Sequence, residues 1–375
     1  MIVVHFPSWF PFAGRPHHGN FILRQIEAAG AHTTAIVLHH INDDFDTEAL
    51  SSYSNIIFYP IKVPKDISKT RLFSAYCTTA FQNIVRQYGK PDLIHLHVAL
   101  PLGPIAAFLS RKYNIPLVVS EHWSIYKPIN WSSIRLAQKI MMRFTFRTAR
   151  GITTVSEDLH NTIVNTYPFT SRIPFFHISN VVNTKIFKTS SQVRTFEKKQ
   201  ILHISTLDNN AKNIMGILSA IKELSEIRKD FILNIIHDLS NEDVENYISK
   251  NHLEDFVHLL GEKSEEEVAQ HIQESDFILM FSNYENQPCV LLEAFCCGKP
   301  AITTPVGGIP EVANSQNAVF VEPRNENQLV EKLNFLLDNR TAFEESGISQ
   351  SARERFSPET IGQLFYSAYQ KTLQK

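Results

Sequence analysis

Short apolar runs alternate with amphipathic stretches along nearly the whole chain, and this alternation restricts the possible folds more than any other feature. Six runs in the first half resemble buried parallel strands: residues 2–6, 34–38, 55–59, 93–97, 116–120 and 151–155. Five more follow at residues 200–205, 231–236, 256–260, 277–281 and 300–304. Helix-like segments separate the runs, so the pattern predicts β-α-β units and parallel sheets.

The two series of strands predict two domains, because 375 residues are enough to bury two cores. The polar segment 188–199 lacks apolar periodicity and is the predicted linker. We therefore expect a Rossmann-like domain over residues 1–187 and a second one over residues 200–356. Residues 357–375 predict a closing helix whose single apolar stripe must dock on another element.

Two glutamates stand where parallel sheets bind ligands, beyond the carboxyl ends of the strands. Glu285 follows the run 277–281 and precedes a helix that starts near Pro288, so its carboxylate can accept hydrogen bonds from sugar hydroxyls. The first N–H groups of that helix, at residues 289–291, can face a diphosphate. Glu293 is predicted half buried and can bind a ribose diol. The spacing alone favours a plainer interpretation, a loop charge and a helix glutamate stabilised by the helix dipole.

Composition excludes several other classes of protein. The formal net charge is −2, which gives no general attraction to nucleic acid. Glycine is scarce, at 13 residues, and neither G-x-G-x-x-G nor a P-loop motif occurs. The four cysteines form no C-x-x-C pair, which predicts reduced, packed thiols and no metal site. The chain has neither a charged secretory n-region nor an apolar run long enough to span a bilayer, so we expect a cytoplasmic protein.

The segment "CGKPAITTPVGGIPEVA" (297–313) changes the interpretation of the glutamates. It predicts a strand followed by paired glycines, which allow a close backbone approach. With Glu285 and Glu293 it resembles the E-x7-E signature of the retaining family 4 glycosyltransferases. Further segments resemble the same family: residues 7–30, 91–103, 115–123, 152–159, 178–187 and 201–213. The resemblance implies the GT-B fold, an α/β architecture of two Rossmann-like domains facing each other across a cleft. It also implies that the closing helix crosses back to the N-terminal domain.

The resemblance also implies roles. The donor would be a nucleotide diphosphate sugar, with UDP favoured, and the acceptor a hydroxyl of a glycan or lipid-linked glycan. Glu285 would contact the donor sugar, Glu293 the ribose, and Lys212 the leaving diphosphate, with retention and without a metal or other cofactor. His122 and His97 would lie on the acceptor side. The other implied donor-binding residues are Gly19, Thr206, Asn286, Gln287, Pro288, Cys289 and Val290.

Plainer interpretations stay open for the cation and the histidines. The local sequence by itself favours a solvated loop lysine at Lys212 and a satisfied strand-end histidine at His122. His95 and His97 lie two residues apart in one predicted strand, so their side chains share a face. For these two the residues predict a buried, hydrogen-bonded pair.

The chain departs from the family pattern in the nucleotide domain. Ser205-Thr206 stands where Gly-Arg is usual, so the second phosphate-binding cation is absent, and His237-Asp238-Leu239 replaces a Gly-Asp-Gly turn. Either Lys212, the helix N-terminus and another basic residue suffice, or the donor site is degenerate. Asn286-Gln287-Pro288 replaces a Gly-Phe-Gly-like turn and could select the sugar. The alternative functions are a sugar-nucleotide 2-epimerase of the same architecture and a non-catalytic sugar-nucleotide-binding subunit.

A basic stripe is the last feature. Its cations recur every four residues along one predicted helix and continue just beyond it: Arg135, Lys139, Arg143, Arg147 and Arg150. No acidic residue lies between Glu121 and Glu157. An apolar side is predicted from Leu136, Ile140, Met141 and Phe144. The stripe predicts either contact with an anionic membrane, at its inner face, or a solvated helix packed on the sheet.

Overall fold

The computed structural model describes residues 1–11, 19–41, 55–62, 70–190, 196–238 and 241–374. These residues form two compact α/β units, the first made of Met1–Val181 and Pro358–Lys375 and the second of Val182–Ser357. Three parts of the predicted segments lie outside the described residues: 12–18 of the donor loop, 191–195 of the linker, and Leu239.

The first unit contains a parallel sheet with the strand order β3-β2-β1-β4-β5-β6-β7. Its strands are β1 (Ile2–Pro7), β2 (Thr34–Ile41), β3 (Ile56–Lys62), β4 (Leu93–His97), β5 (Leu117–Glu121), β6 (Gly151–Thr154) and β7 (Phe175–His177). Six of them follow the predicted runs closely. Strand β7 was not predicted, because a partly exposed strand of three residues carries too short an apolar run to stand out.

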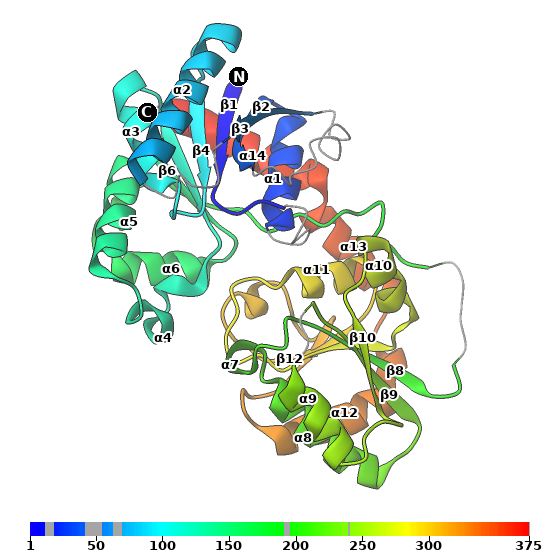
Figure 1. Cartoon of the computed structure of the whole chain (residues 1–375). Coiled ribbons are helices and arrows are strands. Elements are labelled where there is room, and N and C mark those ends of the chain that lie inside the picture. The colour runs from blue at the N-terminus through cyan, green and yellow to red at the C-terminus, as the bar shows by residue number, and fades with distance from the viewer. Residues whose placement is uncertain (12–18, 42–54, 63–69, 191–195, 239–240, 375) are drawn as a thin grey trace. The chain divides into compact units, whose positions relative to one another are not determined.

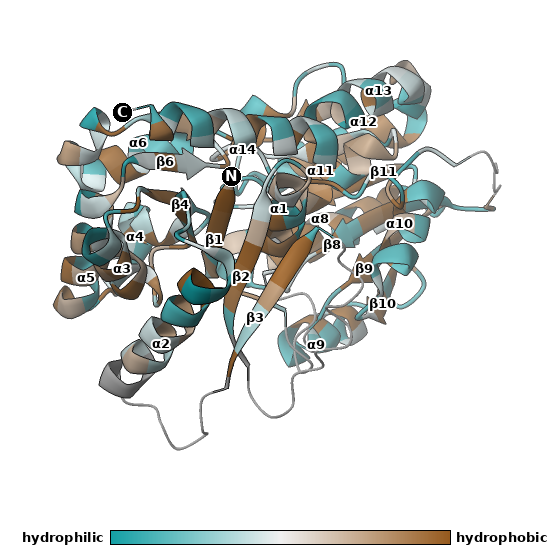
Figure 2. Cartoon of the chain, turned by 90° about the horizontal axis from the view of Figure 1, so that it is seen from above, coloured by the Kyte–Doolittle hydropathy of each residue, from teal (hydrophilic) through white to brown (hydrophobic). Residues whose placement is uncertain are grey.

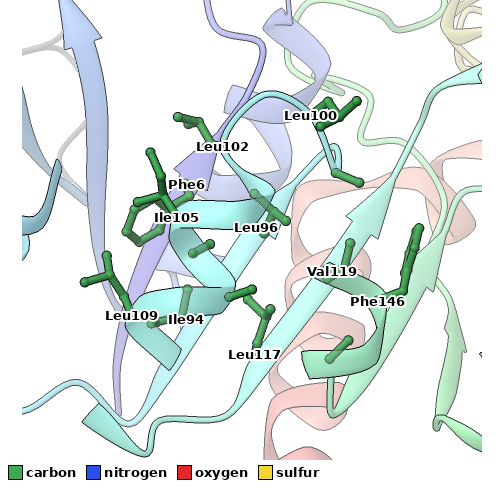
Figure 3. Packing of buried hydrophobic residues seen from close by; sticks show 14 of the residues in the cluster. Phe6, Ile94, Leu96, Leu100, Leu102, Ile105, Leu109, Leu117, Val119 and Phe146 are labelled. Atoms are coloured by element: carbon green, nitrogen blue, oxygen red, sulfur yellow. The ribbon is translucent and has the colours of Figure 1, made fainter. Parts of the chain in front are cut away.

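Helices cover this sheet. They are α1 (Asn20–Gly30), α2 (Thr70–Tyr88), α3 (Gly103–Tyr113), α4 (Pro128–Trp131), α5 (Leu136–Thr148), α6 (Glu157–Thr166) and α14 (Pro358–Leu373). The main core packs side chains of α3 and α5 onto strands β1, β4 and β5, as Figure 3 shows for Ile105, Leu109 and Phe146. Figure 2 shows β1 in brown, as expected for a strand that is buried between layers.

The closing helix α14 belongs to the first unit, which confirms the predicted return to the N-terminal domain. It packs against α1 (Figure 1) and buries Ile361, Phe365 and Tyr369. Gly362 allows this approach, because a Cβ there would meet the carbonyl oxygen of Ala28.

The second unit contains a parallel sheet with the order β10-β9-β8-β11-β12-β13. Its strands are β8 (Lys199–Ile204), β9 (Phe231–Ile236), β10 (Val257–Gly261), β11 (Phe277–Met280), β12 (Ala301–Thr303) and β13 (Ala318–Phe320). Its helices are α7 (Asn209–Lys212), α8 (Ile214–Ile227), α9 (Glu242–Lys250), α10 (Glu265–Glu274), α11 (Cys289–Cys296), α12 (Glu326–Asn339) and α13 (Glu345–Phe356). Because β8 and β11 are neighbours in the sheet, the loops that follow them emerge side by side.

The boundary between the units lies earlier than the predicted end of the first domain at residue 187. Val182 and Phe187 belong to the core of the second unit, and the Val182 backbone N–H donates to the Phe356 carbonyl at 2.9 Å. Cys296 and Cys297 are buried in the same core, which confirms that these thiols pack. Burial raises the pKa of the Cys297 thiol to about 12.

Candidate functional site

Lys212 and Glu285 meet although 73 residues separate them in the chain. Lys212 ends α7 after β8, and Glu285 follows β11, so the adjacent strands bring both to the same edge of the sheet. The Lys212 Nζ lies 2.5 Å from Glu285 Oε1, and the two side chains are 21% and 10% exposed. The solvated loop lysine is therefore wrong for Lys212, which forms a largely buried ion pair.

Two hydroxyl groups at the ends of β11 and β12 hold the Glu285 loop in place. The Ser282 hydroxyl donates to Glu285 Oε1 at 2.8 Å, and the Thr304 hydroxyl donates to the Ser282 carbonyl at 2.7 Å. Both hydroxyls are buried, so the carboxylate sits on a fixed support. Ser282 and Thr304 were not predicted as site residues, although Ser282 directly follows a predicted strand and Thr304 ends one.

A second set of bonds holds the Lys212 loop. The Asn283 backbone N–H donates to the Ala211 carbonyl at 2.7 Å, and its side-chain amide donates to the Asn210 carbonyl at 3.0 Å. Arg324, in the loop after β13, donates from Nε to the Asn283 Oδ1 at 3.1 Å. Asn283 and Arg324, both absent from the predicted site, thus position the turn that carries the lysine.

The start of α11 contains the other predicted donor residues of this unit. Pro288 is the N-cap, and Cys289 and Val290 are the first helical residues, half buried. The Asn286 carbonyl accepts from the Gly308 N–H at 2.8 Å, which ties this turn to the paired glycines after β12. Gln287 and Glu293 are buried, so Glu293 is more enclosed than predicted.

The exposed Thr206 follows β8 where the family usually has arginine. Ser205 organises this loop, since its hydroxyl accepts from the Leu207 N–H at 3.1 Å and bonds to His203 Nε2 at 2.7 Å. Burial lowers the pKa of His203 to about 4, so the imidazole is neutral near pH 7. The loop therefore presents no cation at residue 205 or 206.

In the first unit, Glu121 ends β5 as a fully buried carboxylate. It accepts four hydrogen bonds: from the N–H groups of Ala99 (3.0 Å), His122 (3.1 Å) and Trp123 (3.1 Å), and from the Tyr126 hydroxyl (2.8 Å). Burial raises its pKa, and these hydrogen bonds act in the opposite direction. Glu121 thus fixes the backbone at His122, a role that was not predicted from the sequence.

His122 and the start of α1 lie together. The His122 ring packs on Phe21, with 5.0 Å between the ring centroids, and burial lowers the His122 pKa to about 3. Gly19 is the N-cap of α1, with φ of 74°, and a Cβ there would lie 2.7 Å from the Trp9 carbonyl carbon. Only glycine combines that φ with such close packing without strain.

His95 and His97 lie side by side on one face of β4, fully buried, as predicted. His95 bonds through Nδ1 to the Tyr369 hydroxyl at 2.8 Å and through Nε2 to the Ser120 hydroxyl at 2.7 Å. His97 bonds through Nε2 to Nδ1 of His5 at 3.1 Å. The predicted pair is therefore a network of three histidines. The missed member, His5, lies beside His95 because β1 pairs with β4.

These three histidines are also the group, among the described residues, whose ligand atoms lie close enough for a metal ion, within 4.8 Å of one another. His95 uses both ring nitrogens in hydrogen bonds, so coordination would require it to release Tyr369 or Ser120. The contacts describe a hydrogen-bonded core cluster in which burial keeps the imidazoles neutral by lowering their pKa.

The basic stripe lies on α5 and the residues that flank it. The helix buries Met142, Thr145 and Phe146, whereas Leu136 is 73% and Ile140 57% exposed. Leu136 and Ile140 of the predicted apolar side therefore do not pack on the sheet, because α3 and the sheet contact the face turned away from them. No helix within the described residues is long and apolar enough to cross a membrane.

Two family models match adjoining parts of the chain. The model described as Glycosyltransferase Family 4 matches residues 22–185, and the model described as Glycosyl transferases group 1 matches residues 186–356. The chain is 29% identical over 310 residues to an uncharacterized glycosyltransferase of Methanocaldococcus jannaschii, and the match covers 79% of each chain. It is 28% identical over 245 residues to N-acetyl-alpha-D-glucosaminyl L-malate synthase of Bacillus anthracis, over 61% of this chain and 60% of that protein.

Solved structures with the same fold include sucrose-phosphate synthase from Thermosynechococcus elongatus, with a TM-score of 0.81, 16% identity, and coverage of 100% of this chain and 99% of that one. They also include the Anabaena protein HepE in complex with UDP, with a TM-score of 0.78, 18% identity, and coverage of 99% of this chain and 100% of that one. Similarity to these structures shows the fold. The two family models, which together span residues 22–356, show the family. The chain belongs to the glycosyltransferases of family 4 and has the GT-B fold.

Proposed function

We propose that the protein is a retaining glycosyltransferase that transfers a sugar from a nucleotide diphosphate donor to an acceptor hydroxyl. The observation that carries this proposal is the Lys212–Glu285 ion pair at the carboxyl ends of adjacent strands. Both bonds to the Glu285 carboxylate, from Lys212 and Ser282, use Oε1. Its Oε2 can therefore accept from a donor-sugar hydroxyl without breaking the pair.

The proposed role of Lys212 is to stabilise the leaving diphosphate. Its ammonium has three N–H donors and gives one to Glu285, so it can also donate to a phosphate oxygen. The first N–H groups of α11, from Cys289 onward, face an anion in the same way. These donors would stabilise the negative charge that develops on the phosphate, and a protein general acid is then not required.

In this scheme the acceptor oxygen attacks the anomeric carbon on the face from which the diphosphate leaves. The bond from that carbon to the phosphate oxygen breaks, the bond to the acceptor oxygen forms, and the acceptor proton passes to the leaving phosphate. No step uses a metal ion or another cofactor. We place His122, with His97 behind it, on the acceptor side. The neutral His122 can accept a hydrogen bond there, because burial lowers its pKa to about 3.

UDP is the nucleotide that we favour, supported by the Anabaena HepE structures in complex with UDP and with UDP-glucose. Glu293 would bind the ribose, and Thr206 and the turn 286–288 would complete the part of the donor site that lies in the second unit. Thr206 supplies no positive charge, so Lys212 is the proposed cation at the diphosphate. The contacts of Asn283 and Arg324 hold the turn that carries Lys212 in place. A glycan or lipid-linked acceptor in surface polysaccharide synthesis fits this chemistry.

The test begins with a thermal-shift screen of UDP- and GDP-sugars, followed by product analysis with the best binder. Free nucleoside diphosphate plus a glycoside supports transfer, whereas an isomerised donor supports the 2-epimerase. Replacing Glu285 with alanine should lower turnover at least about a hundredfold. The control is Lys332→Ala, which removes an ion pair with Glu331 in α12. Donor binding without turnover in any acceptor mixture would favour the non-catalytic subunit.

We also propose contact between α5 and the inner face of an anionic membrane. The supporting observation is that the exposed Leu136 and Ile140 share this helix with Lys139, Arg143 and Arg147. Apolar side chains beside cations are the surface that a peripheral membrane helix requires. Packing against the sheet does not explain why Leu136 and Ile140 are apolar, because α5 buries other residues there.

Sedimentation with vesicles that contain phosphatidylglycerol checks this contact. Lys139→Glu combined with Arg143→Glu should release the protein. The exposed lysines of the second unit provide a control with the same charge change, Lys222→Glu combined with Lys250→Glu, which should still sediment. If both double variants bind alike, or if the wild-type protein does not bind, the proposed contact is wrong.

A further inference from the structure

A cavity of about 390 Å³ lies in the first unit at the edge of the sheet where β5 and β6 begin. Pro116 directly precedes β5 and Arg150 directly precedes β6, whereas His122 follows the other end of β5. The cavity is therefore at the opposite edge of the sheet from the proposed acceptor-side residues. Its volume is near the lower end of the range for small-ligand pockets, roughly 300–1,000 Å³.

Three arginines line this cavity, Arg111, Arg147 and Arg150. No acidic residue is among its described lining residues. Within the part of the chain that the structure describes, none of the three forms a salt bridge. Exposed cationic side chains that line one cavity without a carboxylate leave a surplus of positive charge and of N–H donors.

Aromatic rings orient two of these side chains. The Arg111 guanidinium lies over the Phe144 ring, 4.8 Å from its centroid, and the Arg147 guanidinium lies over the Phe169 ring at 5.3 Å. A ring contact occupies the flat face of a guanidinium and leaves N–H donors at its edge for an anion. The Arg150 backbone N–H donates to the Leu117 carbonyl at 2.7 Å, which anchors that residue at the sheet edge.

Arginines near helix C-termini have a simpler explanation, which is attraction to the negative end of the helix dipole. The ends of α3, α5 and α14 do meet at this cavity. Each end contributes about −0.5 of an elementary charge, so together they offset about half of the three arginine charges. A net positive charge of about 1.5 remains for a ligand.

We infer that the Arg111–Arg147–Arg150 cavity binds a phosphate monoester. A phosphate dianion matches the remaining charge, and its three terminal oxygens can accept from three guanidinium groups, whereas one arginine would satisfy a carboxylate. The volume admits the phosphate with one small attached group. Such a ligand could be a free phosphometabolite or the head group of a phosphatidic-acid-like lipid, and the binding chemistry is the same.

Calorimetric titration with glycerol 3-phosphate tests the free source. Wild type should bind, and Arg111→Gln combined with Arg150→Gln should weaken binding at least about tenfold. The control Lys112→Gln removes a neighbouring exposed cation that does not line the cavity and should bind like wild type. Thermal unfolding of each variant verifies that it is folded.

The lipid source is tested by flotation with phosphatidylcholine vesicles with and without phosphatidic acid. Flotation that requires phosphatidic acid and is lost in the double-arginine variant, without binding of glycerol 3-phosphate, assigns the cavity to a lipid head group. The inference is overturned if neither probe distinguishes the double variant from wild type, or if Lys112→Gln weakens binding equally. It is also overturned if Lys212→Ala, and not the arginine variant, abolishes binding, because the phosphate would then occupy the donor site.

Discussion

Each unit places a glutamate at or just beyond the carboxyl end of a strand in its parallel sheet, and the two carboxylates make different contacts. Glu121 in the first unit is fully buried and accepts hydrogen bonds from four neighbours, without a cation. Glu285 in the second unit is also largely buried, but it pairs with Lys212 and accepts its hydrogen bonds through one oxygen only.

The contrast separates a structural carboxylate from one that a ligand can reach. Four donors use the acceptor capacity of Glu121, and they hold the turn that carries His122 and Trp123. Glu285 retains an oxygen that neither Lys212 nor Ser282 uses, beside a cation suited to a phosphate. Position at a strand end is therefore not sufficient to identify a functional carboxylate, because what matters is which of its lone pairs the fold leaves available.

The largest effect on stability is expected for Glu121→Ala. The substitution leaves three backbone N–H groups and the Tyr126 hydroxyl without their acceptor in a buried site. Because each unsatisfied buried group costs about 1–3 kcal/mol, we expect a loss of about 3–5 kcal/mol after partial relaxation. Chemical denaturation that follows the unfolding of the first unit measures this loss. A loss below about 1 kcal/mol would mean that Glu121 does not support the turn.

In contrast to Glu121→Ala, the substitution Glu285→Gln should lower activity more than it lowers stability. The amide keeps the size of the side chain but removes the charge that pairs with Lys212, so turnover should fall by about 10²–10³. The free energy of unfolding should fall by less than in Glu121→Ala, because the amide oxygen can still accept from Lys212 and Ser282. Steady-state kinetics and denaturation of the same preparation give both values. If Glu285→Gln loses as much stability as Glu121→Ala, the two carboxylates do not differ in role.

Stability is also expected to depend on pH. Burial lowers the pKa of His5 to about 3, and in the unfolded chain histidine titrates near its ordinary value of about 6.5. Between these values the unfolded state binds more protons, so the free energy of unfolding falls as the pH falls. The slope is about 1.4 kcal/mol per pH unit for each such histidine.

This slope should be steeper for the first unit, which buries His5, His95 and His97, than for the second, whose buried His203 has a pKa lowered to about 4. Denaturation between pH 4.5 and pH 7 measures the slope of each unfolding transition. His5→Leu should reduce the slope of the first transition even if it also lowers stability at pH 7. An unchanged slope in that variant would show that His5 is not kept neutral by burial.

Local pattern determined much of this protein. Apolar runs of five or six residues sufficed to locate the longer strands, because both faces of a parallel sheet are buried and favour apolar residues. The positions of Lys212, Glu285 and His122 after strands followed from the same pattern. The closing helix α14 could be predicted because its apolar stripe needed a partner, whereas the partner itself, α1, could not.

Only the tertiary structure decided which of these residues meet. The contacts of Lys212 with Glu285 and of His5 with His97 depend on strand order, which joins segments 73 and 92 residues apart and leaves no local trace in the sequence. The same applies to the arginine cavity, which gathers the ends of three helices, and to Leu136 and Ile140, whose exposure depends on where α3 packs. Periodicity describes one element at a time, and burial, pairing and charge surplus are properties of several elements packed together.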